Sequence, residues 1–269
     1  MEYLKALVLG IVQGVTEWLP ISSTAHLLIV DDLIRLNGSS DFKDLFLVLV
    51  QLGSILAVVV LYFNELFPFK HDRVERNRSF SLWLKIIVAS IPAAILGLLL
   101  DDIVSSYLST IWVIAGALAL YGILYIALEK SGFAQRRVKY ENVEEVSLKK
   151  AFCLGLFQSL AIIPGTSRSG STILGGMVLG LSRELSAKFS FFMAIPVMAG
   201  ASLLRFLKHF AIVSAREWSL LLFATSISFL VSMLSIKWLV GFVRKHSFVG
   251  FGVYRIVLAF ILVIYMVLK

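Results

Sequence analysis

Charge and cysteine are both scarce in this 269-residue sequence. Only 16% of the residues are Asp, Glu, Lys or Arg, whereas soluble domains contain about 25%. Apolar residues make up 59%, compared with roughly 45–50% in a soluble domain. Cys153 is the only cysteine, which excludes an intramolecular disulfide and a disulfide-stabilised scaffold. The composition therefore also excludes a soluble enzyme and a disordered chain.

Three stretches contain no charged residue and are long enough to cross a bilayer: Leu45–Asn64, Ile103–Leu128 and Trp218–Ile236. Further apolar segments lie near 4–19, 21–30, 80–100, 151–163, 171–181, 189–207 and 248–268. These patterns predict an all-α polytopic membrane protein. The net charge of +8 is then explained by basic cytoplasmic loops, so we predict no nucleic-acid partner.

The segments around Pro20 and Pro164 are short and interrupted, and they contain ionisable residues. Broken backbone at membrane depth is tolerated where it is buried in protein or lines a wet cavity, so we predict a re-entrant helical hairpin at each. The two stretches also resemble each other. Five residue pairs share one separation: Lys5 and Lys150, Ala6 and Ala151, Leu9 and Leu154, Gly10 and Gly155, Gln13 and Gln158. One residue of slippage then aligns Pro20 with Pro164 and Ser23 with Ser167.

This repetition predicts one integral membrane domain over 1–269. Repeat 1 spans about 1–130, a linker spans 131–148, and repeat 2 spans about 149–269. Each repeat contains one re-entrant hairpin and three transmembrane helices, and because three is odd the two repeats have inverted topologies. Placing 31–44 outside puts the most basic loops inside, in agreement with the positive-inside rule.

The first polar motif is QGVTEWLPISSTAH, at 13–26. Gln13 and Glu17 are four residues apart and share one face of a helix. A carboxylate at that depth is costly and normally has a partner or a function. The residues that follow at the proline are Ser22, Ser23, Thr24 and His26. The structural alternative is that these hydroxyls satisfy backbone groups freed at a kink.

The second motif is PGTSRSGST, at 164–172, with one arginine among five hydroxyls. A guanidinium offers a planar fork of donors for phosphate oxygens, and a helix N-terminus aims free N–H groups at an anion. The motif therefore predicts a phosphate cradle made of Gly165, Ser167, Arg168, Ser169 and Thr172. The structural alternative is a buried ion pair between Arg168 and Glu17, which is compatible with catalysis.

The two motifs together supply a charge clamp, nucleophiles and an acid or base for phosphoryl transfer on a lipid-linked substrate. A polyprenyl-phosphate transporter or flippase is the main alternative, because inverted repeats with broken helices are typical of transporters. The type 2 phosphatidate phosphatases are a weaker alternative, since their Lys-x6-Arg-Pro signature is absent.

Both motifs, together with VQLGSILAVVV at 50–60, resemble those of the bacterial undecaprenyl-diphosphate phosphatase family, known for bacitracin resistance. The resemblance implies hydrolysis of undecaprenyl diphosphate to undecaprenyl phosphate and inorganic phosphate, which recycles the carrier lipid for peptidoglycan synthesis. It also implies a Mg²⁺ or Ca²⁺ cofactor, the bacterial inner membrane, and a site toward the periplasmic side. Glu17 is the main candidate metal ligand. Gln13 is a weak candidate, because some members have a charged Glu at this position, whereas Gln is uncharged.

From the chemistry of the motifs and from the family resemblance, we expect the catalytic residues to be Glu17, Ser23, His26 and Arg168. Ser22, Thr24, Gly165, Ser167, Ser169 and Thr172 are expected to help Arg168 bind phosphate. The nucleophile stays open among His26, Ser23 and water. The expected partners are the membrane and a polyprenyl diphosphate lipid, and a homodimer is left open.

Overall fold

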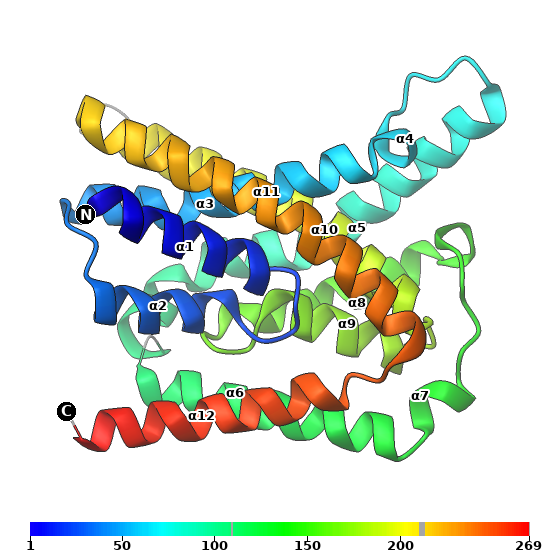
Figure 1. Cartoon of the computed structure of the whole chain (residues 1–269). Coiled ribbons are helices and arrows are strands. Elements are labelled where there is room, and N and C mark those ends of the chain that lie inside the picture. Colours follow the sequence, from blue (N-terminus) through cyan, green and yellow to red (C-terminus); the bar gives the residue numbers. More distant parts are fainter. Residues whose placement is uncertain (109, 210–212, 269) are drawn as a thin grey trace.

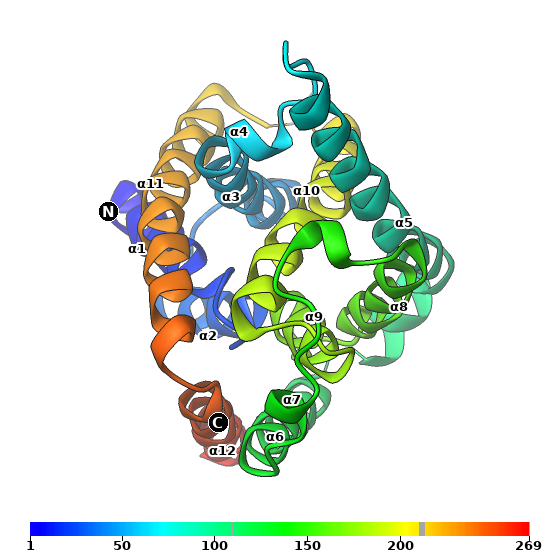
Figure 2. The same cartoon turned by 90° about the vertical axis from the view of Figure 1, so that its right-hand side faces the viewer.

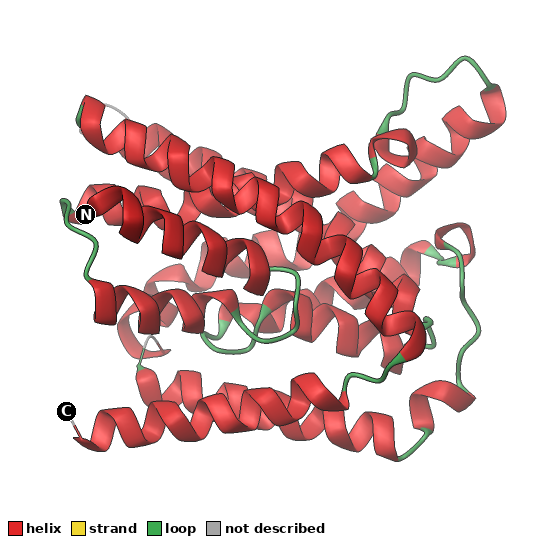
Figure 3. Cartoon of the chain, in the orientation of Figure 1, coloured by secondary structure: helices red, strands yellow, loops and turns green. Residues whose placement is uncertain are grey.

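The structure is a computed structural model that describes residues 1–108, 110–209 and 213–268. Regular structure in these residues is helical, apart from one isolated bridge (Figure 3). The long helices are α3 (Ser40–Leu61), α5 (Arg73–Ile103), α6 (Ile111–Lys130), α10 (Arg183–His209), α11 (Ala215–Lys245) and α12 (Val249–Leu268). The short ones are α1 (Glu2–Thr16), α2 (Ser23–Ile34), α4 (Phe63–Leu66), α7 (Phe133–Arg136), α8 (Leu148–Ser159) and α9 (Arg168–Val178). Val143–Glu145 and Leu160–Ile162 form 3₁₀ turns, and Val104–Leu108 forms a π turn.

The six long helices are each apolar and long enough to cross a membrane. The prediction of an all-α polytopic membrane protein is confirmed at this level. The uncharged run Ile103–Leu128 is not one helix, however. A break precedes α6, whose first turn is capped by the Thr110 side chain as it accepts a hydrogen bond from the N–H of Val113.

The short helices form two hairpins, α1 with α2 and α8 with α9, each made of antiparallel helices (Figure 1). The turn of each hairpin lies near the middle of the long dimension of the molecule. The two hairpins run toward the middle from opposite ends of the molecule. Viewed end-on, α9 lies inside a ring of long helices, and the paired α6 and α12 form one edge (Figure 2). The hairpin turns are therefore surrounded by protein.

The second helix of each hairpin begins after a serine in an unusual conformation. Ser22 precedes α2 with φ of 72°, and Ser167 precedes α9 with φ of 71°. Only a few per cent of non-glycine residues have positive φ. Ser22, and not Ser23, therefore occupies the place equivalent to Ser167. The slippage that aligns Pro20 with Pro164 is taken up within the turns.

Glycines allow the hairpins to pack closely against long helices. A Cβ at Gly10 would lie 2.8 Å from a main-chain oxygen of α11, and one at Gly155 would lie 2.4 Å from a main-chain oxygen of α5. Gly122 of α6 and Gly252 of α12 contact each other reciprocally, since a Cβ on either would lie 2.7 Å from the carbonyl oxygen of the other. Each hairpin thus packs closely against one long helix, and α6 packs closely against α12.

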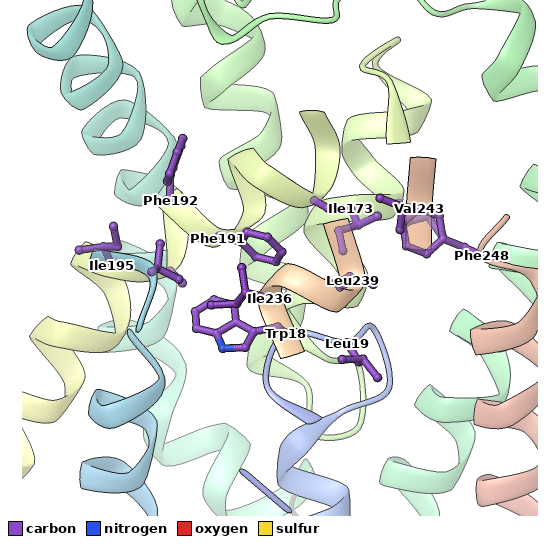
Figure 4. Close-up of a cluster of buried hydrophobic side chains, with 14 of the residues drawn as sticks. Trp18, Leu19, Ile173, Phe191, Phe192, Ile195, Ile236, Leu239, Val243 and Phe248 are labelled. Carbon is purple, nitrogen blue, oxygen red and sulfur yellow. The ribbon is translucent and has the colours of Figure 1, made fainter. Parts of the chain in front are cut away.

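A buried apolar cluster joins the first hairpin turn to the long helices (Figure 4). Trp18 is completely buried, and its ring meets that of Phe191 of α10 edge-on, with centroids 5.2 Å apart. Ile236 of α11 and Ile173 of α9 belong to the same cluster. This close packing fixes the turn against the long helices and places the neighbouring Glu17 inside the protein.

The loops are divided between the two ends of the molecule. The segments predicted to be inside lie at the end that carries α4 and α7, and those predicted to be outside lie with both termini (Figure 1). The linker 131–148 is largely exposed, but Ala134 and Val146 are buried against the bundle. The distribution of charge therefore matches the path of the chain.

Candidate active site

Two cavities contain charged side chains. The larger one, about 800 Å³, lies at the α4 and α7 end. Its cations are mostly paired, as in Lys188 with Glu65 at 2.7 Å and Lys70 with Glu75 at 3.4 Å. The smaller one, about 130 Å³, lies between the two hairpin turns. Because it joins both predicted motifs, it is the candidate active site.

An ion pair links the two motifs at this cavity. Nη2 of Arg168 donates a hydrogen bond to Oε1 of Glu17 at 2.9 Å. The Glu17 side chain is 5% exposed and that of Arg168 is 13% exposed. A pair so shielded from water is strongly coupled, and removing one partner leaves the other charge without compensation.

The second carboxylate oxygen of Glu17 is occupied by the first hairpin itself. Oε2 accepts hydrogen bonds from Ser23 Oγ at 2.7 Å and from Gln13 Nε2 at 3.0 Å. The bond to Gln13 follows from their spacing on α1, as predicted. The Ser23 hydroxyl is thus held against a carboxylate that is able to accept its proton.

Arg168 is also held by contacts other than Glu17. Its Nη1 donates to the carbonyl oxygen of Ser190 of α10 at 2.9 Å, and the guanidinium carbon lies 5.3 Å from the centre of the Trp18 ring. Nε is buried and makes no hydrogen bond to any residue that the structure describes. Arg168, which lines the cavity, thus keeps one donor that none of these residues uses.

Most of the predicted site residues line this cavity. From the first motif they are Glu17, Ser22, Ser23 and Thr24, and from the second Gly165, Ser167, Arg168 and Ser169. Gln51 of α3 and Met198 of α10 also line it, and the sequence analysis did not single them out. The cavity is thus dominated by hydroxyl groups around one carboxylate and one guanidinium.

Ser169 and Thr172, which are both predicted to bind phosphate, donate hydrogen bonds to main-chain carbonyl oxygens. Ser169 Oγ donates to the carbonyl oxygens of Glu17 and Leu19, at 3.2 and 3.0 Å, and so ties the two turns together. Thr172 Oγ1 donates to the carbonyl oxygen of Arg168 at 2.9 Å and is absent from the cavity lining. Thr172 therefore supports the arginine rather than facing the cavity.

His26 is outside the cavity lining. Its Nδ1 lies 2.8 Å from the carbonyl oxygen of Ser22, and its Nε2 lies 2.7 Å from the hydroxyl of Tyr254 of α12. Both ring nitrogens are thus engaged away from Glu17 and Arg168. The structure does not bring this predicted catalytic residue to the other three.

Arg255 of α12 is a structural partner of the site that the sequence analysis missed. It is completely buried and donates to carbonyl oxygens of both turns: Pro20 at 3.0 Å, Gly165 at 2.8 Å and Thr166 at 2.9 Å. Arg255 is the only charged residue in α12. A lone charge in a spanning segment is a signal of function that could have identified it.

The residues around Glu17 do not fit a resident divalent cation. Within the described ranges, no group of three or more His, Cys, Asp or Glu side chains is placed to hold a metal. Glu17 is the only carboxylate at the cavity, and it is already paired with the Arg168 cation. Mg²⁺ is usually held by one or two carboxylates together with substrate phosphates, so a cation at this site would need oxygens from the substrate.

The fold and the site define a class of protein: a multi-pass helical membrane protein with a buried cluster of one guanidinium, one carboxylate and several hydroxyls between two hairpin turns. Comparison with known families then identifies the chain more closely. Residues 6–261 match the model of the bacitracin resistance protein BacA, and the chain belongs to this family.

Individual relatives cover nearly the whole chain. Undecaprenyl-diphosphatase 1 of Clostridioides difficile (strain 630) is 47% identical over 267 residues, which are 98% of this chain and 96% of the relative. The undecaprenyl-diphosphatase of Acetivibrio thermocellus is 45% identical over 98% of both chains. That of Enterococcus faecalis is 45% identical over 98% of this chain and 97% of the relative. The family resemblance predicted from the two motifs is confirmed.

Proposed function

We propose that this protein is an undecaprenyl-diphosphate phosphatase, which releases inorganic phosphate and leaves undecaprenyl phosphate. The observation that carries this proposal is the cluster of Arg168, Glu17 and Ser23 in a cavity between the hairpin turns. The names of the relatives support the same activity. The transporter alternative is not favoured, because the relatives are named as diphosphatases. Transport would also not require a carboxylate in contact with a serine hydroxyl.

In the proposed reaction, the terminal phosphate binds beside Arg168, where the Nε donor and the hydroxyls of Ser167 and Thr24 face the cavity. Ser23 Oγ attacks the terminal phosphorus, and its proton passes to the Glu17 carboxylate 2.7 Å away. The bond from that phosphorus to the bridging oxygen breaks, and undecaprenyl phosphate leaves. Glu17 passes the proton it took from Ser23 to the departing bridging oxygen and becomes ionised again. Water then hydrolyses the phosphoserine, with Glu17 accepting a proton of the water and returning it to the Ser23 oxygen as inorganic phosphate leaves.

In the resting site the guanidinium neutralises Glu17 through Nη2. Phosphate bound to Nε leaves that pair in place. The Glu17 carboxylate thus stays in contact with the Ser23 hydroxyl and is placed to receive its proton during attack.

The test is phosphate release by the purified protein in detergent, with farnesyl diphosphate and undecaprenyl diphosphate as substrates. We expect release from both and almost none from a Ser23→Ala variant. Ser226→Ala is the matched control, because Ser226 lies exposed on α11 far from the cavity lining. Absence of phosphate release by the wild-type protein would refute the proposed activity, and full activity of Ser23→Ala would refute serine as the nucleophile.

For the architecture, we propose two inverted repeats, each with a re-entrant hairpin, separated by the linker 131–148. The corresponding Ser22 and Ser167 conformations and the corresponding glycine contacts support this arrangement. We further propose a bacterial plasma membrane location, with the α4 and α7 end in the cytoplasm and the site accessible from the other side. The basic loops at the α4 and α7 end support this orientation.

Orientation is tested by cysteine labelling in a Cys153→Ala background. Asn37→Cys lies at the end that carries both termini, and Lys139→Cys lies at the opposite end. A membrane-impermeant maleimide should label Asn37→Cys in intact cells and Lys139→Cys only after permeabilisation. The reverse pattern would overturn the proposed orientation.

The cation that the family resemblance implies, Mg²⁺ or Ca²⁺, is proposed to reach the site on the diphosphate of the substrate. The support is the donor set, in which a single carboxylate is already paired with an arginine.

A further inference from the structure

The rings of His26 and Tyr254 are stacked, with centroids 5.6 Å apart and an angle of 5° between their planes. A carbonyl oxygen only accepts hydrogen bonds, so the bond to Ser22 places the ring proton of His26 on Nδ1. In the neutral ring, Nε2 then accepts a hydrogen bond from the Tyr254 hydroxyl at 2.7 Å. The lone pair that a nucleophilic histidine would use is therefore occupied.

The carbonyl that His26 holds belongs to the strained serine of the first turn. Ser22 has φ of 72°, a conformation that costs about 1–2 kcal/mol for a residue with a side chain and persists only where contacts hold it. The next residue is Ser23, whose hydroxyl bonds to Glu17. The orientation of the peptide at Ser22 thus determines where the Ser23 hydroxyl begins.

Two successive residues of α12 hold this turn. Arg255 donates directly to the carbonyl oxygen of Pro20 at 3.0 Å, and Tyr254 acts through His26 on the carbonyl oxygen of Ser22. The clamp therefore comes from the last helix of the chain and acts on the first hairpin.

We propose that Tyr254 is a positioning residue for the reaction described above, acting through His26 to hold the turn that presents Ser23. In this role His26 supplies a hydrogen-bond donor to Ser22 and forms no bond to phosphorus. The inference rests on the proposed phosphatase activity and on serine attack.

Amide isosteres of histidine provide the first test. An asparagine amide places an N–H near the position of Nδ1, whereas a glutamine amide places its polar group near Nε2. We expect His26→Asn to keep at least tenfold more activity than His26→Gln. If His26 were the nucleophile, both variants would be equally inactive, and equal inactivity contradicts the proposal.

Tyr254→Phe is the second test, because it keeps the stacked ring and removes only the hydroxyl. We expect kcat to fall about tenfold, the rate equivalent of one hydrogen bond, with KM within twofold and the melting temperature unchanged. Tyr265→Phe is the matched control: Tyr265 also lies on α12 and bonds to α2, but at Asp32, away from the turn. A Tyr254→Phe enzyme with wild-type kcat, or a Tyr265→Phe enzyme with the same loss, overturns the proposal.

Trapping the phosphoenzyme separates this inference from the proposed function. Rapid acid quench of the wild-type enzyme with labelled diphosphate should give acid-stable phosphoserine. Acid-labile phosphate on His26 overturns the positioning role while leaving the phosphatase activity intact. A wild-type enzyme that releases no phosphate refutes the proposed function itself.

Discussion

Arg168 and Glu17 are 151 residues apart in the chain, yet Nη2 of the arginine lies 2.9 Å from Oε1 of the glutamate. The arginine begins the second helix of one hairpin, and the glutamate ends the first helix of the other. The site therefore exists only when both hairpin turns meet.

Arg168→Lys should reduce kcat/KM for undecaprenyl diphosphate by at least about a hundredfold, the usual cost of removing a donor to a developing anionic oxygen. Lysine keeps the positive charge but cannot reach Glu17, Ser190 and a phosphate oxygen from one planar group. Phosphate release and the melting temperature are measured together. A folded variant with activity within threefold of wild type contradicts the role of the guanidinium.

Arg255→Met should lower the stability of the protein by about 3–5 kcal/mol, because the buried carbonyl oxygens of Pro20, Gly165 and Thr166 lose their donor. Thermal unfolding in detergent measures this change. Arg216→Met, at an exposed position on α11, is the control and should leave the melting temperature unchanged. Equal melting temperatures for the two variants would show that Arg255 does not clamp the turns.

Gly155→Ala should destabilise the protein by about 1–3 kcal/mol, since the added Cβ would lie 2.4 Å from a main-chain oxygen of α5. Gly97→Ala is the matched control within α5, because no described atom lies within 4 Å of its added Cβ. We expect that substitution to be neutral or to stabilise by up to about 1 kcal/mol. The measurement is again thermal unfolding, and a reversed order of the two variants would disprove the close contact of α8 with α5.

Chelation should abolish phosphate release without changing the melting temperature. Activity should be lost because the cation is proposed to arrive on the diphosphate of the substrate. The melting temperature should not change because the Glu17 site offers one carboxylate already paired with Arg168. Added Mg²⁺ or Ca²⁺ should restore activity, and neither should shift unfolding in the absence of diphosphate. A stabilising shift from the cation alone would indicate a resident metal site.

The sequence alone predicts the helical membrane class, the two polar motifs and the family, because each depends on composition or on residues close in the chain. Uncharged runs require a bilayer, and the spacing of Gln13 and Glu17 already places them on one helical face. The break before α6 was not predicted, since the run 103–128 contains no charge to mark it. Arg255 was overlooked because its partners are main-chain carbonyls, which leave no trace in the side-chain pattern.

Only the tertiary structure decides how the predicted site residues divide. Ser23 contacts Glu17, whereas His26, three residues further on in the same helix, is bonded to Tyr254 of α12, and the chain spacing alone does not separate the two partners. The left-handed serine that sets this register is bonded to His26, and His26 is bonded in turn to Tyr254 of α12, more than two hundred residues away. Local sequence therefore determined which chemical groups are present, and long-range packing determined which of them meet.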